Sequence, residues 1–295
     1  IFFRAAMPCP ARLTCGASEH RNDGHHRLNV IKKQLDDLGG ANVVGRLLRE
    51  YRLLNGQRGL ASFDGYFYIN LANRRDRRTH IESLLKKYGV PEALVRRVDA
   101  VRQPHNGHLG CVQSHIKALA MAKAAGLANV MIFEDDFDFT VPKSEVDDTL
   151  DRALTELDDR WDVIHIGINP EKVEKSKIGG VARRILAATT SACYAINGPF
   201  YDRLLENYQD AEAKLKEDME KYGEIQCTPY ALDRHWKPLQ ATSKWYGIIP
   251  MIGQQKTTQS SIMHNEWRVH PSCQRKIDGV YPADAPYHLW HDDDS

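Results

Sequence analysis

The chain has 295 residues, of which 42% are hydrophobic and 27% charged, a composition that excludes a disordered or low-complexity protein. Its 40 basic and 39 acidic residues leave a formal net charge of +1, so we expect no general electrostatic attraction to nucleic acid or to an anionic membrane. No run of residues is apolar and long enough to predict a membrane-spanning helix.

The six cysteines are widely spaced, without a CxxC pair or zinc-finger spacing. We therefore expect mostly reduced thiols, with a disulfide between Cys9 and Cys15 left open. The predicted location is the cytoplasm, either free or associated peripherally with a membrane. Because the first residue is Ile1 and not Met, a targeting segment can precede the sequence.

Residues 1–65 differ in pattern from the rest of the chain. Residues 1–27 lack periodicity and predict a loose arm. Between Leu28 and Leu54, apolar residues recur with helical spacing on both sides of a Gly39-Gly40 pair, which predicts two amphipathic helices. We treat residues 1–65 as an N-terminal segment outside the main domain.

From residue 66 onward, predicted strands alternate with predicted helices. The aromatic and β-branched run YFYINL at 66–71 predicts a buried strand, and Ile81, Leu84, Leu85 and Tyr88 have the spacing of a helix. Further strands are expected before Val98 and over 130–133, 161–169 and 245–250, and further helices over 112–125, 146–157 and 210–221. The segment 210–221 is highly charged, which is typical of a solvated helix or a lid.

This rhythm predicts an α/β fold with a mostly parallel central sheet and helices on both faces, spanning residues 66–264. Residues 265–295 have no clear period and are expected to form a tail. In such sheets ligands bind beyond the carboxyl ends of the strands, so residues that follow a strand are candidate site residues.

Three carboxylates, those of Glu134, Asp135 and Asp136, directly follow the apolar strand at 130–133. Like charges at the edge of an apolar core repel one another and lose hydration, so they need a counter-charge. Because alternate side chains of a strand share a face, Glu134 and Asp136 are expected to converge on one Mg²⁺ or Mn²⁺, with Asp135 pointing elsewhere. The alternative is that these acids cap a helix or begin a turn.

Four arginines in NRRDRR, residues 73–78, follow the first strand and begin a helix. The free N–H groups of a helix start bind anions, and arginine grips phosphate or sugar oxygens. At least one of the four is expected to contact such oxygens, and we choose Arg78. The alternative is a solvated first turn in which Asp76 complements the helix dipole.

The segment GHLGCVQSHIKA, residues 107–118, places two glycines before a helix that carries Ser114 and His115. Neighbouring helix residues point apart, so these two do not form a nucleophile and its base. No GxSxG, P-loop, HExxH or GxGxxG in its proper context is present. Serine hydrolases, P-loop NTPases, zincins and Rossmann dehydrogenases therefore lack their characteristic residues here.

Four motifs taken in order, YINLANRRDRR, VDA, HLGCVQSHIKAL and VMIFEDDFDF, resemble glycosyltransferase family 25. That family includes bacterial lipopolysaccharide and lipooligosaccharide glycosyltransferases and the collagen galactosyltransferases. The resemblance extends over about residues 66–262. It implies a GT-A-like fold, a nucleotide-sugar-binding sandwich in which an acid-x-acid motif holds Mn²⁺, or Mg²⁺, against the diphosphate of a UDP-sugar.

The resemblance also implies site residues. Those expected around the donor nucleotide are Asn70, Leu71, Arg78, Asp99, Ser114, Glu134 and Asp135. Those expected to bind the metal are Glu134, Asp136 and His264. Gln255 and Ser260 are expected to contact donor or acceptor from a polar loop. Asp233 is expected to deprotonate the acceptor hydroxyl, because inversion needs a base, and its alternative role is a structural helix cap. His115 is expected to pack behind the site.

The predicted function is the metal-dependent, inverting transfer of galactose or glucose from a UDP-sugar to a glycan or glycoconjugate acceptor. One alternative is a catalytically inactive binding module that keeps the fold, against which the retention of Glu134 and Asp136 argues. Another is a metal-dependent nucleotidyltransferase or phosphohydrolase, which would be expected to carry a glycine-rich phosphate loop. Neither the acceptor nor the oligomeric state follows from the sequence.

Overall fold

The computed structural model describes residues 56, 59–158, 160–174, 180–223 and 228–256. The chain divides into two units, Ile1–Leu47 and Leu48–Ser295, and all described residues belong to the second. The predicted arm, the two amphipathic helices, Ser260, His264 and the tail lie outside the described residues. Within the described part, no helix is both long and apolar enough to cross a membrane.

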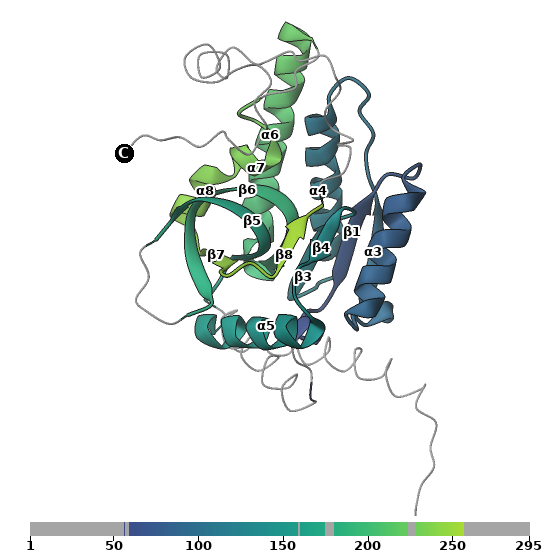
Figure 1. Ribbon diagram of the computed structural model, residues 1–295. Coiled ribbons are helices and arrows are strands. Elements are labelled where there is room, and N and C mark those ends of the chain that lie inside the picture. The colour runs from purple at the N-terminus through teal and green to yellow at the C-terminus, as the bar shows by residue number, and fades with distance from the viewer. Residues whose placement is uncertain (1–55, 57–58, 159, 175–179, 224–227, 257–295) are drawn as a thin grey trace, which may run out of the picture. The chain divides into compact units, whose positions relative to one another are not determined.

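A six-stranded sheet with the order β2-β1-β3-β6-β5-β7 forms the centre of the described domain (Figure 1). Its strands are β1 (Tyr66–Asn70), β2 (Val95–Asp99), β3 (Asn129–Glu134), β5 (Val163–Val173), β6 (Ala182–Asn197) and β7 (Trp245–Ile248). Strand β6 is antiparallel to β3, β5 and β7, whereas the other pairs are parallel. The predicted mostly parallel sheet is confirmed, with one reversed strand that the sequence pattern did not single out.

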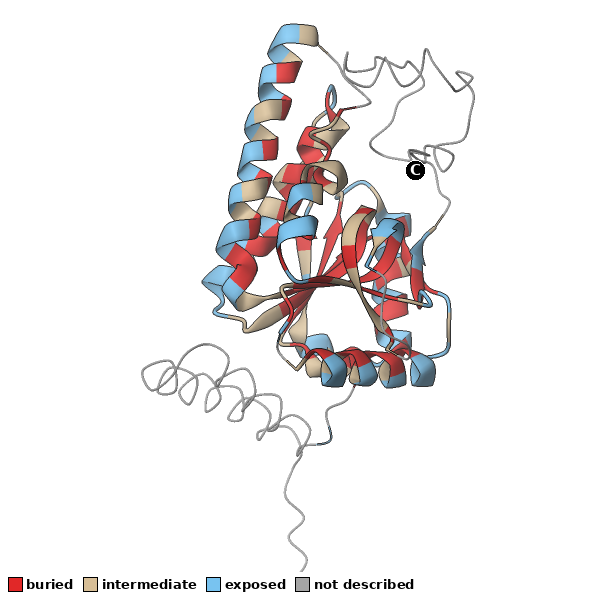
Figure 2. Cartoon of the chain, turned by 90° about the vertical axis from the view of Figure 1, so that its left-hand side faces the viewer, coloured by how far each residue is buried: buried red, intermediate tan, exposed pale blue. Residues whose placement is uncertain are grey.

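Helices cover both faces of the sheet, as predicted. Those on one face are α3 (Arg75–Lys87) and α5 (Lys143–Leu157), and those on the other are α4 (Gly107–Ala124), α6 (Tyr201–Tyr222), α7 (Leu232–His235) and α8 (Lys237–Thr242). Both faces are covered because the strands are apolar on both sides. In β1, Tyr66 and Tyr68 are buried in one core and Phe67 and Ile69 in the other. The helices turn their buried residues toward the sheet and their exposed residues outward (Figure 2).

Short 3₁₀ helices extend this framework: η1 (Gly59–Ser62), η2 (Glu92–Leu94) and η3 (Gly198–Phe200). Leu60 of η1 and Phe63 are buried in the same core as α3 and α5, so the packed domain includes residues that precede β1. Helix α4 begins before its apolar period does, because the side chain of Asn106 accepts a hydrogen bond from the backbone N–H of Leu109 at 2.9 Å.

The charged segment 210–221 is the second half of α6 and is helical, as expected. It is a packed helix and not a lid, because Ala211 and Leu215 are buried in the core that α6 shares with α4. Solvated charges on the outer side and buried residues on the inner side are both compatible with the helical period.

A second, two-stranded sheet brings a late part of the chain to the acidic triplet. Strand β4 (Phe137–Phe139) pairs in antiparallel fashion with β8 (Gly253–Gln255), so that Phe137 lies opposite Gln255. A Cβ atom on Gly253 would lie only 2.3 Å from the Phe137 ring, so glycine permits this close approach. This pairing places the Gln255 side chain beside Asp136.

Candidate functional site

The carboxyl ends of β1, β2 and β3 lie side by side and carry polar residues. Asn70 pairs in register with Asp99, and Ile69 with Glu134. Beyond these ends lies a cavity of about 290 Å³. Its walls come from the segment after β1, from residues 100–104 after β2, from the first turns of α4, and from Glu134 and Asp135. The cavity therefore lies where the sequence analysis placed ligand binding.

One wall of the cavity depends on a close approach between α4 and the loop after β2. A Cβ atom on Gly110 would lie 2.6 Å from the carbonyl oxygen of Val101, so only glycine fits. The hydroxyl of Ser114 accepts a hydrogen bond from Val101 N at 2.8 Å and donates one to Gly110 O at 2.6 Å. Ser114 lines the cavity, and its buried hydroxyl holds this wall in place.

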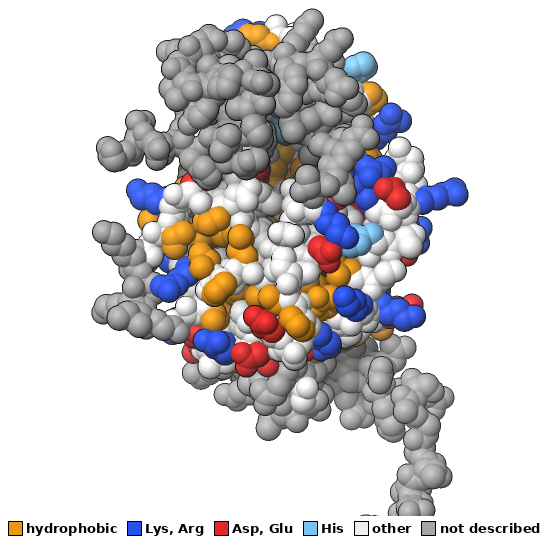
Figure 3. Space-filling model, viewed as in Figure 1, with side chains coloured by type: hydrophobic (Ala, Val, Ile, Leu, Met, Phe, Trp, Pro, Cys, Tyr) orange, Lys and Arg blue, Asp and Glu red, His pale blue; other side chains and the backbone are white. Residues whose placement is uncertain are grey.

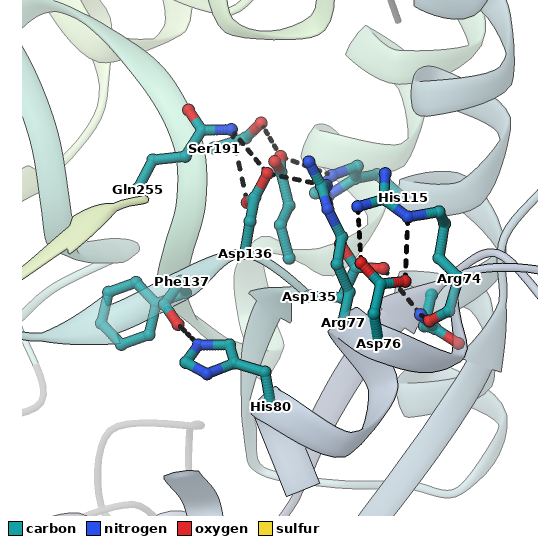
Figure 4. A network of polar contacts seen from close by, with 12 residues as sticks. Arg74, Asp76, Arg77, His80, His115, Asp135, Asp136, Phe137, Ser191 and Gln255 are labelled. Atoms are coloured by element: carbon teal, nitrogen blue, oxygen red, sulfur yellow. Dashed lines mark hydrogen bonds and ion pairs between the residues drawn. The ribbon is translucent and has the colours of Figure 1, made fainter. Parts of the chain in front are cut away.

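Asp135 and Asp136 share one cationic partner, the guanidinium of Arg77. Arg77 Nη1 lies 3.1 Å from Asp135 Oδ1 and 2.8 Å from Asp136 Oδ2. Asn70 Nδ2 donates to Asp135 at 2.7 Å, and Gln255 Nε2 lies 3.3 Å from both oxygens of Asp136 (Figure 4). All three charged residues are at most 9% exposed. Arg77 thus supplies, from within the chain, the positive charge that the buried carboxylates need.

The expected arrangement of the triplet, with Asp135 pointing away from the pair Glu134 and Asp136, differs from the observed one. Strand β3 ends at Glu134, and Asp135 and Asp136 form a turn into β4. The alternation of side chains stops where the strand stops, so Asp135 joins Asp136 at Arg77. Glu134 instead accepts a hydrogen bond from the hydroxyl of Ser191 in β6.

Burial and mutual repulsion shift the protonation of these carboxyls. Burial, followed by the nearby charge of Glu134, raises the pKa of Asp136 to about 6. Burial likewise raises the pKa of Asp135, although Asn70 and Arg77 oppose it. Burial alone would raise the pKa of Glu134, but its contacts with His115 and Ser191 outweigh this and lower it. Glu134 is therefore the member of the triplet whose pKa is lowered, whereas the pKa values of Asp135 and Asp136 are raised.

A buried chain of polar groups leads from Glu134 into the core beneath α4 and α6. His115 Nε2 lies 3.4 Å from Glu134 Oε1, and His115 Nδ1 lies 2.7 Å from the hydroxyl of Tyr194. The Tyr194 hydroxyl lies 3.0 Å from that of Tyr208. His115 packs against the sheet, as expected, and its imidazole is also positioned by these contacts.

Part of the chain is similar to members of glycosyltransferase family 25. Human "Inactive glycosyltransferase 25 family member 3" is 31% identical over 37% of this chain and 23% of that protein, and its mouse counterpart is 29% identical over the same shares. The chain thus spans less than a quarter of the length of these relatives, which are themselves named inactive. No protein-family model matches the chain. The resemblance noted in the motifs is therefore supported for a part of the sequence.

Solved structures with a related arrangement include several transferases. A glycosyltransferase involved in glycosylation of the major capsid of PBCV-1 overlaps 66% of this chain and 94% of its own, with a TM-score of 0.35 and 9% identity. A mutant of Drosophila galactosyltransferase 7, in complex with manganese, UDP-Gal and xylobiose, overlaps 74% and 76%, with a TM-score of 0.32 and 12% identity.

The residues expected around the donor nucleotide are not all in one place. Leu71, Ser114, Glu134 and Asp135 line the cavity. Asn70 is 1% exposed and lies behind Asp135. Two other predicted residues stand apart from this group. Asp99 is exposed at the end of β2 and is paired with Arg97, and Arg78 pairs with Glu82 on the exposed side of α3, where basic side chains gather (Figure 3).

Arg77 was missed by the choice of Arg78 among the four arginines. A signal for it exists in the sequence, because Arg77 precedes Ile81 by four residues and so lies on the apolar side of the helix. Arg78, the next residue, is rotated by about 100° around the helix axis, and its side chain is exposed. An arginine on an apolar helix face, next to a strand that ends in acids, is the pattern that would have found this contact.

Asp233 lies in the first turn of α7 and accepts a hydrogen bond from the backbone N–H of Thr190 at 3.0 Å. Thr190 has a positive φ of 77°, which is uncommon for a residue other than glycine, so this bond supports an unfavourable backbone conformation. The charge of Asp233 also acts on the Cys111 thiol, whose pKa is raised by burial first and by Glu134, Asp233 and Asp136 after it. Asp233 is therefore within electrostatic range of the cavity.

Proposed function

We propose that this chain is a sugar transferase that binds a UDP-hexose, with galactose or glucose as the sugar, and transfers it to a hydroxyl of a glycan or glycoconjugate. One observation carries the proposal. The cavity beyond β1, β2 and β3 is lined by the carboxylates of Glu134 and Asp135 and by Arg74 and Arg77. Asp135 shares its cationic partner Arg77 with Asp136, which lies next to the cavity lining in the chain. A diphosphate and its counter-ions need this combination of charges.

The carboxylates fit the divalent ion that the resemblance implies. Asp135 and Asp136 direct one oxygen each at Arg77 Nη1, so two oxygen donors already converge on a single positive atom. Glu134 and Asp136 would hold Mn²⁺ or Mg²⁺ when Arg77 turns away, with Asp135 as a further oxygen donor. When bound, such an ion supplies positive charge to the departing diphosphate.

The remaining chemistry is assigned to the side chains of this chain. Ile69, Leu71 and Val101 offer apolar contacts for a base in the cavity, and Arg74 at its margin binds phosphate oxygens. Asp233 removes the proton of the acceptor hydroxyl as that oxygen attacks the anomeric carbon and UDP departs. Asp233 Oδ2 is held by Thr190, and its Oδ1 has no hydrogen bond within the described residues, so this oxygen can accept the proton.

A second candidate function is a binding module that holds a nucleotide sugar without transferring it. The observation in its favour is the ion pair between Arg77 and the two aspartates, which places a cation of the chain where a metal would be needed. The relatives named inactive point in the same direction. The two functions differ in metal dependence and in the release of UDP.

The test is calorimetric titration of UDP into the protein with Mn²⁺ and again with chelator. We expect micromolar binding that requires the metal and that weakens about 100-fold or more in Asp136→Ala. Asp138→Ala is the matched control, because Asp138 pairs with Lys256 outside the cavity and should leave binding unchanged. Equal binding by Asp136→Ala would refute the metal assignment, and absence of binding under both conditions would refute the proposed function.

Turnover separates the two candidates. UDP-galactose and UDP-glucose are incubated with the protein, Mn²⁺ and simple saccharide acceptors, and released UDP is measured. A transferase releases UDP, and Asp233→Asn reduces this release while UDP binding is retained. Binding of UDP without any release from either sugar nucleotide favours the binding module.

A further inference from the structure

Cys111, His115 and Glu134 form a cluster in the wall of the cavity, and the proposed function does not use the three residues together. Cys111 and His115 are four residues apart on α4 and so lie on the same side of that helix. Glu134 comes from the end of β3. The cysteine sulfur, one imidazole nitrogen and one carboxylate oxygen all lie within 4.8 Å of one another.

The imidazole of His115 is only 1% exposed, yet its Nε2 has no hydrogen-bond partner in the described part of the chain. The nearest recorded acceptor is Glu134 Oε1, at 3.4 Å. A buried nitrogen that makes no hydrogen bond is unfavourable unless another ligand satisfies it. This nitrogen is directed toward the same space as the Glu134 carboxylate and the Cys111 thiol.

The other nitrogen of His115 has the support that metal-binding histidines require. Nδ1 lies 2.7 Å from the Tyr194 hydroxyl, which lies 3.0 Å from the Tyr208 hydroxyl. With the proton on Nδ1 and donated to Tyr194, and the Tyr194 proton donated to Tyr208, the lone pair of Nε2 is free for a metal. Such a partner on the second nitrogen orients the ring of a ligand histidine.

We propose that Cys111, His115 and Glu134 bind a zinc ion, with a fourth coordination position open to the cavity. A thiolate, an imidazole and a carboxylate are the ligand types that zinc takes, whereas Mn²⁺ and Mg²⁺ prefer oxygen. Zinc ligands lie about 2.0–2.3 Å from the ion, so side-chain movements within the cluster suffice to bind it. All three residues line the cavity, which makes the fourth position reachable by water or by a ligand.

This site shares Glu134 with the proposed site for the hard cation and differs from it in the other ligands, and the inference does not rest on the proposed function. Cys111 and His115 lie on one side of Glu134, whereas Asp135 and Asp136 face Arg77. Zinc binding converts the Cys111 thiol into a zinc-bound thiolate and releases one proton to the solvent. The affinity for zinc should therefore increase as the pH rises.

The test uses Co²⁺ alone, without nucleotide, on the full chain under reducing conditions. Binding of Co²⁺ by a thiolate produces a sulfur-to-metal charge-transfer band in the near ultraviolet, and tetrahedral coordination produces intense visible bands. We expect both with one equivalent of Co²⁺, and their loss when Zn²⁺ is added. Competition with a chromogenic chelator then measures the zinc affinity.

Variants locate the ion. Cys111→Ser should abolish the charge-transfer band and weaken zinc binding about 100-fold or more, and His115→Gln should weaken it by a similar factor with the band retained at high Co²⁺. Cys193→Ser is the matched control, because Cys193 is a buried free thiol outside the cluster and should leave the spectrum unchanged. Circular dichroism verifies that each variant is folded.

Two outcomes would overturn the inference. Wild-type protein that shows no charge-transfer band with stoichiometric Co²⁺ has no thiolate site. A band of equal intensity in Cys111→Ser places the ion on another thiol of the chain. If Cys111→Ser does not fold, Tyr194→Phe is the deciding variant. It removes the hydroxyl that positions His115 and should reduce the zinc affinity about 10-fold. An unchanged zinc affinity in Tyr194→Phe would contradict the site.

Discussion

Carboxylates lie at both ends of the strands of this sheet, and their partners differ in kind. At the carboxyl ends, the rim acids Glu134, Asp135 and Asp136 are held by side chains, chiefly those of Arg77, Asn70 and Ser191.

At the other ends, the base acids Asp64, Asp147 and Asp151 accept hydrogen bonds from the backbone N–H groups of Ala128, Leu60 and Gly59. Backbone partners are fixed by the fold, whereas a side chain can rotate away and be replaced by a ligand. Carboxylates thus have backbone partners at one end of the sheet and side-chain partners, which a ligand can replace, at the other.

The contact between α5 and η1 shows how closely the base acids are fitted to the backbone. Asp151 Oδ1 accepts from Gly59 N at 2.7 Å, and Asp147 Oδ1 accepts from Leu60 N at 3.0 Å. Gly59 has a φ of +55°, and a Cβ atom there would lie 2.2 Å from Asp147. The backbone of η1 thus fills the space beside Asp147 Oδ1 and Asp151 Oδ1, while Asp147 Oδ2 pairs with the side chain of Lys143.

The largest effect is expected from removing the shared partner of the rim acids. Arg77→Met leaves two buried carboxylates without a cation and should lower the free energy of unfolding by about 3–5 kcal/mol in the presence of chelator. Mn²⁺ should restore part of this loss if the rim acids bind a hard cation. Urea unfolding with and without metal measures both effects.

Arg78→Met is the control for this prediction, because Arg78 is the next residue and pairs with Glu82 on the exposed side of α3. Its removal should leave the urea midpoint unchanged within error. Arg77→Met protein as stable as wild type would mean that the rim acids do not need their side-chain partner, which would break the comparison between the two ends of the sheet.

An intermediate effect is expected from the protonation of Asp136. Its pKa in the folded protein is raised from 3.8 to about 6, so the folded state holds the proton more tightly than the unfolded state. The stability from this group is fully present below about pH 3.8 and is lost as the pH rises through 6. Asp136→Asn cannot ionise, so it should gain stability relative to wild type over this interval, by about 2–3 kcal/mol at most.

Thermal unfolding of both proteins from pH 4 to pH 8 in chelator measures this difference. A stability difference that stays constant with pH would contradict the shift assigned to Asp136. Asp138→Asn serves as the comparison, because Asp138 is partly exposed and paired with Lys256 at 3.1 Å. The gain in stability expected for Asp136→Asn should be absent from Asp138→Asn.

The smallest effect is expected at the base acids. Asp151→Ala removes one hydrogen bond to Gly59 N and should lower the free energy of unfolding by about 1 kcal/mol, because a single intramolecular bond is lost. UDP binding should be unchanged, since η1 lies at the opposite end of β1 from the cavity. A loss of UDP affinity in Asp151→Ala would show that the two ends are coupled.

The sequence by itself determined the alternation of strands and helices, the two-sided core and the position of the acids at the end of β3. These features follow from local periodicity, since side chains alternate along a strand and recur every three to four residues along a helix. It also carried the resemblance to family 25, through motifs that are contiguous in the chain.

Only the tertiary structure decided which partners the acids have. Arg77 lies 58 residues from Asp135, Gln255 lies 119 residues from Asp136, and Ser191 reaches Glu134 from the one reversed strand. The cluster of Cys111, His115 and Glu134 likewise joins α4 to β3. Such contacts depend on strand order and register, which arise when both cores close together, and no local period in the sequence records them.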